Sequence, residues 1–409
     1  FRGNLFSAVT AALAVPFVFL AARALLGRLP EATSAGRLAP FIFAAVGAIA
    51  FAVSSVFWSQ ATITEVYALN TLFTAALLWL ALEVRARTDA GRPAAMPLSL
   101  AGLLFGLGMG NHVTLALVAG PFLVWVYWPA LKAREWRKVP LVRPALALLL
   151  GLSVYIYVPV ASAGQPVLSW GHPHTWEGFR WMITGSLYQN YAFSVEGQRL
   201  PQRIIKVFDF LVGQYGIAGV VLGVAGLATL WSRARGLALA SASAAGVVAV
   251  YSVGYRPGDS YIYLIPPFLI FALWLAAGAA SLAATVWQLA RDGRPRWLQS
   301  RTTLIVPLVA AAALAAGPAY IVPAHFGDMN LRGDHEARDH ARDALATAGQ
   351  GGVILADGIQ LFSLWYESYV AQPERDVLVV STALLRFDWY WDDLHRQAPD
   401  RMPAVPPAG

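Results

Sequence analysis

Residues 57–70, which read F-W-S-Q-A-T-I-T-E-V-Y-A-L-N, are unusually polar for a junction between two apolar stretches. Glu65 would suit the first turn of a helix that starts after Thr62 or Thr64, because the helix dipole favours an anion there. Against simple capping, an ionisable side chain at the edge of a membrane normally faces a bundle interior or a wet cavity. We therefore predict a substrate-binding role for the four polar residues Gln60, Glu65, Tyr67 and Asn70.

Asn111 and His112 follow a stretch that contains Gly106, Gly108 and Gly110. Gly110 as a helix C-cap and Asn111 as a turn residue would need no function. A turn alone does not account for His112, although a hydrogen-bonded structural histidine would. Both interpretations stay open, and both residues join the substrate-binding candidates.

A third polar cluster lies at 170–181 and reads W-G-H-P-H-T-W-E-G-F-R-W. His172 and His174 invite a metal site, but two histidines are incomplete, and Glu177 as a third ligand is only conceivable. A Trp-rich segment that rests at a membrane interface explains the tryptophans better. Because such surfaces also contact sugars and lipid phosphates, we predict that Trp170 and His172 flank the substrate, and we rank a metal last.

The fourth cluster, 255–267, reads Y-R-P-G-D-S-Y-I-Y-L-I-P-P. Arg256 and Asp259 could form a surface ion pair that contributes little to stability. Alternatively, the guanidinium of Arg256 could hold a phosphate, whose oxygens match its planar fork. We predict substrate-binding roles for Arg256, Asp259 and Tyr261.

The composition places these clusters in a membrane protein. Of the 409 residues, 57% are hydrophobic and 13% are charged, about half the charged share of a soluble domain. The chain has no cysteine, which excludes disulfides, thiolate metal sites and cysteine nucleophiles. The net charge of +7 is spread over membrane-proximal loops, so nucleic-acid binding is not supported.

A helix needs about 20 apolar residues to cross a bilayer. On this basis we expect ten spans in an all-α polytopic membrane domain covering residues 1–323. The expected spans are 4–27, 39–58, 63–83, 98–111, 113–131, 143–161, 205–231, 236–254, 260–287 and 302–322.

Basic residues gather in five short loops, which the positive-inside rule assigns to the cytoplasm. These loops share one side only if 98–111 and 113–131 are separate spans, and both chain ends then lie outside. All four polar clusters fall on the outer side, where we expect the chemistry. A multispanning chain that starts outside with Phe1 suggests that an upstream helix and most of the first outer loop are missing.

From about residue 324 the composition changes. A charged helical stretch is followed by the apolar runs Val353–Ala356 and Val377–Val380, with helical patterns around 359–370 and 389–395. Alternating strand and helix signals favour a small α/β domain at 324–409, which we place outside the membrane.

The motif at 57–70 resembles the signature of the DUF2723 family of membrane proteins, which is related to protein O-mannosyltransferases of the GT-C glycosyltransferase superfamily. R-G-N-L-F-S-A-V at 2–9, G-N-H-V-T at 110–114, the stretch 157–170 followed by G-H-P, and 259–267 match in the same order. The first motif is fairly specific, and the others gain weight from their order.

The resemblance implies a multi-pass enzyme of the cytoplasmic membrane that transfers a sugar, plausibly mannose, from a polyprenyl-phosphate donor to a protein or glycan acceptor outside. It implies no cofactor besides this donor and leaves a metal requirement open. The acidic D-S-G-E-like and proline-rich stretches of the family are absent, so the catalytic carboxylate is expected upstream of Phe1, with Glu65 as a candidate. The alternatives are a transporter or flippase of lipid-linked sugars, or a noncatalytic membrane scaffold.

Overall fold

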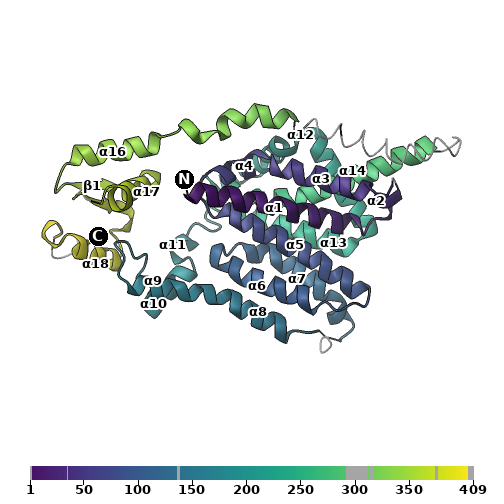
Figure 1. The fold of residues 1–409 in the computed structure, drawn as a ribbon, viewed down its shortest axis with the longest axis horizontal. Helices are drawn as coiled ribbons and strands as arrows, with labels where there is room; N and C mark the ends of the chain where they lie inside the picture. The colour runs from purple at the N-terminus through teal and green to yellow at the C-terminus, as the bar shows by residue number, and fades with distance from the viewer. Residues whose placement is uncertain are drawn as a thin grey trace. The chain divides into compact units, whose positions relative to one another are not determined.

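The computed structural model describes residues 2–34, 36–135, 139–291, 312, 317, 319–373 and 376–403. The chain forms two compact units (Figure 1). Unit 1 comprises residues 1–154 and 190–330, and unit 2 comprises residues 155–189 and 331–409. The sequence predicts a membrane-spanning domain at 1–323 and a domain outside the membrane at 324–409, and that division stays a prediction.

Unit 1 is a bundle of helices. In chain order these are α1 (Arg2–Leu26), α2 (Pro30–Ser34), α3 (Ala39–Ala52), α4 (Ser55–Thr62), α5 (Tyr67–Asp89), α6 (Ala95–Asn111), α7 (Leu115–Lys132), α8 (Val142–Leu152), α12 (Leu200–Arg233), α13 (Arg235–Gly254) and α14 (Ile265–Arg291). The 3-10 turns η3 (Gly197–Arg199) and η4 (Ser260–Leu264) precede α12 and α14.

Seven helices of the described chain are long and apolar enough to cross a membrane. The pair α3 and α4 makes up to eight, although the two are bent by 62° where they meet. The expected ten spans are therefore wrong for the described residues. Helix α6 has only 17 residues, and the stretch 302–322 lies largely outside the described residues. The all-α polytopic class is confirmed.

Alanine and glycine let the helices of unit 1 pack closely. Helix α14 runs through the core, where Phe268, Leu269 and Ala272 are buried. Gly226 of α12 faces the backbone carbonyl of Trp274, and Gly278 of α14 faces that of Leu222. In lipid the hydrophobic effect does not drive helices together. Small residues at such contacts let the backbones approach closely, so that van der Waals packing stabilises the pair.

Two helices of unit 1 are interrupted. Val53 and Ser54 separate α3 from α4, and Gly216 breaks α12 with φ of +66°. A positive φ is readily adopted only by glycine, so Gly216 permits this break.

Unit 2 contains a parallel pair of strands, β1 (Val353–Ala356) and β2 (Leu378–Ser381), in which Val353 pairs with Leu378. Helix α17 (Ile359–Tyr366) and the π-turn 367–371 connect the strands, while α16 (Glu336–Ala348) and α18 (Asp388–Gln397) flank them in the chain. Val379 and Tyr390 are fully buried. The helices α9 (Tyr157–Ala163), α10 (Trp176–Ile183) and α11 (Ser186–Gln189) complete the unit.

The close approach of α12 and α14 predicts a large effect from one added methyl group. Gly226→Ala would drive its Cβ into the carbonyl of Trp274 and should lower the free energy of unfolding by about 1–3 kcal/mol. Gly246→Ala on α13, which has no atom within 4 Å of the added Cβ, is the matched control. Thermal unfolding in detergent would measure both, and equal stability of the two variants would contradict the packing described.

Candidate functional site

The polar motif at 57–70 spans the end of α4, a short link and the start of α5. The link is tied to the first turns of α1, because the hydroxyl of Thr64 donates to Asn4 Oδ1 at 2.5 Å. The backbone N–H of Glu65 donates to Ser7 Oγ at 3.4 Å. No side-chain cap hydrogen bond forms at the start of α5, so Glu65 does not act as a capping residue there. Its side chain is exposed.

Gln60 and Asn70 lie deeper and are buried. The amide oxygen of each has no hydrogen-bond partner within the part of the chain that is described, and neither does the hydroxyl of Thr74 one turn below Asn70. Buried polar atoms are nearly always satisfied. These oxygens can therefore accept hydrogen bonds from water or from hydroxyl groups of a ligand.

Asn111 and His112 connect α6 to the same end of the bundle. The side-chain amide of Asn111 donates to the carbonyl of Val66 at 3.1 Å, which links the end of α6 to the start of α5. His112 Nδ1 accepts from the backbone N–H of Thr114 at 3.4 Å and lies 2.7 Å from its hydroxyl. This arrangement leaves the proton of a neutral imidazole on Nε2. Burial lowers the pKa of His112 to about 4, so the ring is neutral at pH 7.

An aromatic cluster joins these elements. The rings of Tyr67, His112 and Tyr263 lie within 5.6–6.0 Å of one another, and the hydroxyls of the two tyrosines hydrogen-bond. The carboxylates of Glu65 and Asp259 are both close enough to act electrostatically on Tyr67. Unit 1 therefore brings together three of the four predicted polar clusters.

The loop that carries Arg256 and Asp259 is held by Arg203 of α12. Its guanidinium donates to the carbonyls of Tyr255 at 2.5 Å and Arg256 at 2.7 Å, and to Ser260 Oγ at 3.2 Å. The guanidinium of Arg256 lies over the ring of Tyr191, 4.9 Å from its centroid. No ion pair joins Arg256 to Asp259, two residues that the structure describes.

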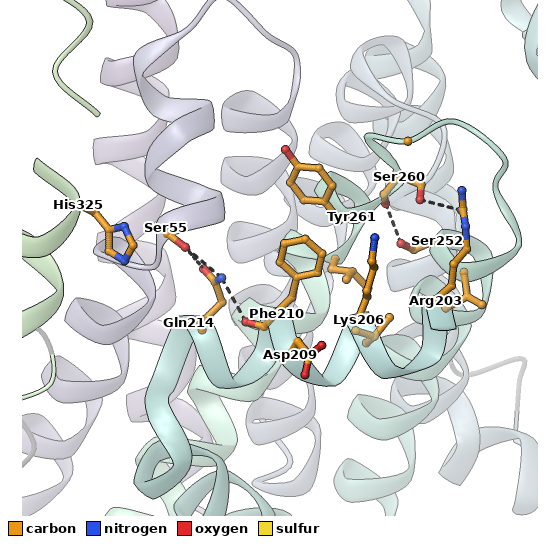
Figure 2. Close-up of a pocket in the computed structure, with 15 residues that line it drawn as sticks. Ser55, Arg203, Lys206, Asp209, Phe210, Gln214, Ser252, Ser260, Tyr261 and His325 are labelled. Carbon is orange, nitrogen blue, oxygen red and sulfur yellow. Dashed lines mark hydrogen bonds between the residues drawn. The ribbon is translucent and has the colours of Figure 1, made fainter. Parts of the chain in front are cut away.

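A cavity of about 620 Å³ borders this loop (Figure 2). Arg203, Lys206 and Asp209 line it from the first half of α12, and Tyr261 stacks on Phe210 with ring centroids 4.8 Å apart. Sequence reasoning found Tyr261 but missed the three charged residues. Their regular spacing of three positions at the start of an apolar helix was the available signal.

The two helix breaks meet at Gln214, at the margin of this cavity. Its side-chain oxygen accepts from the backbone N–H of Val56 at 3.0 Å, in the first turn of α4. Its side-chain nitrogen donates to Ser55 Oγ at 3.1 Å and to the carbonyl of Phe210 at 3.2 Å. Gln214 is almost fully buried, and Figure 2 shows it pointing to Ser55.

Trp170 and His172, the remaining predicted site residues, belong to unit 2. His172 Nε2 lies 2.9 Å from Asp393 Oδ1, and this fully buried carboxylate also accepts from Ser169 N and Arg396. Trp170 and His172 both pack near Trp389. These contacts give both residues structural partners inside unit 2. The described residues contain no group of three His, Cys, Asp or Glu that could hold a metal.

The lowered pKa of His112 predicts a pH-dependent stability. Between pH 6.5 and 4 the unfolded histidine binds a proton that the folded one does not, so stability falls as the pH drops, by at most about 1.4 kcal/mol per unit. His112→Gln should flatten the change of the thermal midpoint across this window. His340→Gln, at an exposed position of α16, should leave it as it is, and an identical slope for all three proteins would contradict the burial of His112.

Comparison with known proteins finds two similarities. Residues 1–137, which include Glu65 and His112, match the family model described as the N-terminal domain of Protein O-mannosyl-transferase TMEM260. Protein O-mannosyl-transferase TMEM260 of Mus musculus is 23% identical over 404 residues. No solved structure matches significantly.

The match to the mouse protein covers 97% of this chain, and the chain spans only about half (55%) of the length of that relative. The two findings support an O-mannosyltransferase-like family, while the DUF2723 and GT-C assignments stay predictions. This chain is thus similar to Protein O-mannosyl-transferase TMEM260.

Proposed function

We propose that this protein is a membrane glycosyltransferase of the O-mannosyltransferase type, which moves a sugar from a polyprenyl-phosphate carrier to a hydroxyl on the outer face of the membrane. The observation that carries the proposal is the meeting of Glu65, Asp259, Tyr67 and His112 at one end of the bundle. The similarity to protein O-mannosyl-transferase TMEM260 supports the reaction class.

Two exposed carboxylates lie at this end, and transfer to a hydroxyl needs one general base. A carboxylate removes the proton of the acceptor hydroxyl while the oxygen of that hydroxyl attacks the anomeric carbon of the sugar. The new glycosidic bond forms as the bond between that carbon and the phosphate oxygen breaks, and the polyprenyl phosphate leaves with the electron pair. Glu65 and Asp259 are the candidates for the base in this chain.

The departing phosphate needs a cation, and Lys206 is suited to supply it. The side chain of Lys206 lines the 620 Å³ cavity (Figure 2), whereas Arg203 already donates three hydrogen bonds to the loop. Among the described residues, no acidic partner lies within ion-pair distance of Lys206. A lysine ammonium binds phosphate as a point charge.

A lipid carrier also needs an apolar path, and a second cavity of unit 1 offers one. This cavity, of about 510 Å³, lies between α5, α6, α7 and α8. It begins at Thr74, one turn from Asn70, and at Leu115, next to the partner of His112, and it extends to Val84. An isoprenoid chain fits such a lining, which supports a lipid-linked donor over a water-soluble one.

The carboxylate role predicts the effect of neutral variants on sugar transfer. Glu65→Gln or Asp259→Asn should lower kcat by about 10²–10⁴-fold, because the amide cannot accept the acceptor proton. Transfer of labelled mannose from polyprenyl-phosphate mannose to a protein acceptor would measure this in reconstituted vesicles.

Matched controls keep the interpretation specific. Glu196→Gln removes an exposed carboxylate whose partner is Arg199, and it should leave kcat unchanged. Lys206→Gln should raise the KM for the donor, whereas Lys132→Gln at the far end of α7 should not. Full activity of both carboxylate variants would remove Glu65 and Asp259 from the mechanism, and absence of transfer with a folded protein would reject the function.

One observation favours a second candidate, a transporter or flippase of lipid-linked sugars. Transporters bind substrates at discontinuous helices, and here the break between α3 and α4 meets the break at Gly216 through Gln214. The vesicles separate the two functions, because a flippase would move the labelled lipid across the bilayer without forming a covalent product.

A further inference from the structure

Unit 2 contains a small polar pocket that the proposed transfer reaction does not use. The pocket has a volume of about 260 Å³, below the roughly 300–1,000 Å³ of sites for drug-sized ligands. Its lining combines a carboxylate, a guanidinium, an indole, two hydroxyls and an amide, which belong to Glu177, Arg180, Trp181, Thr184, Ser186 and Gln189.

The local fold explains why these groups face one space. Positions 177, 180, 181 and 184 recur at helical spacing and share one face of α10 and its end. Gly185 then takes φ of +62°, which turns the chain into α11. The side-chain amide of Gln189 donates to the carbonyl of Thr184 at 3.1 Å and closes the turn.

The two charged residues of the pocket are unpaired within the described part of the chain. Glu177 and Arg180 make no ion pair and no side-chain hydrogen bond with any residue that the structure describes. Glu177 lies in the first turn of α10, where the helix dipole favours an anion. That position explains a carboxylate at 177, but it does not explain an unpaired guanidinium and an indole beside it.

Trp181 is fixed in place from the other side. Its ring contacts Phe387 and Trp389 at centroid distances of 5.7 and 6.0 Å, and a Cβ on Gly171 would come within 2.7 Å of it. The indole is therefore held in one orientation while it also lines the pocket. A rigid aromatic surface with polar groups around it can contact the apolar C–H face of a sugar ring.

We propose that this pocket binds one neutral hexose unit of a glycan. The carboxylate of Glu177 would repel an anionic ligand, and the guanidinium of Arg180 would repel a cationic amine. A sugar hydroxyl can donate a hydrogen bond to Glu177 and accept one from Arg180. The size of the pocket suits a single ring. The inference goes beyond the proposed transfer reaction, since binding requires neither the lipid donor nor the carboxylates of unit 1.

Saturation-transfer NMR on the full chain in lipid nanodiscs tests the proposal and avoids maltoside detergents, which carry hexoses. The probes are methyl α-mannopyranoside, methyl α-glucopyranoside and methyl α-galactopyranoside. At least one should receive saturation, and its Kd should rise about tenfold in Glu177→Gln, since a hydrogen bond to a charged group is lost.

Trp176→Ala is the matched control, because Trp176 is an exposed tryptophan of the same helix that does not line the pocket. It should bind the sugar as the unchanged protein does. Absence of saturation in all three glycosides would overturn the proposal, and so would equal weakening by Trp176→Ala. If the protein transfers sugar but binds none of the three glycosides, this inference fails while the proposed function stands.

Discussion

The cost of an unsatisfied polar group in lipid determines where this protein can place chemistry. A membrane helix satisfies its backbone internally, so free backbone donors and acceptors occur at helix ends and helix breaks. Glu65 lies in the link before α5, His112 lies between α6 and α7, and Asp259 lies before η4. The candidate site is consequently an assembly of helix ends at one end of the bundle.

The basic residues near the candidate site differ in whether their donors hold the protein's own loop or face the cavity. Arg203 donates to two backbone carbonyls and one hydroxyl of the loop 255–260, and it thereby positions Asp259 and Tyr261. Arg256, which we expected to hold the donor phosphate, lies against Tyr191, and that role stays a prediction. Lys206 lines the cavity and has no ion-pair partner within the described part of the chain, so we propose Lys206 as the phosphate partner.

Much of the candidate site could be predicted from the sequence, because polar residues between apolar spans are expected at the ends of those spans and not in the lipid. Glu65, His112 and Asp259 were expected on the outer side of a membrane, and the structure places them around Tyr67, while the side of the membrane stays a prediction. The bend between α3 and α4 could not be read, since Val53 and Ser54 include neither proline nor glycine. The contact of His172 with Asp393 joins residues 221 positions apart, a separation at which neither spacing nor composition carries information.

The state of the two helix breaks bears on the choice between transferase and transporter. In a transporter, the backbone groups freed by a break coordinate the substrate or an ion. Here the N–H of Val56, which the break before α4 frees, is taken by Gln214, and Gln214 also donates to Phe210 above the break at Gly216. The amide therefore ties the first turn of α4 to the segment of α12 that precedes Gly216. The N–H that the break before α4 frees is already bonded within the protein and is not offered to a substrate or an ion, which favours the transferase over the transporter.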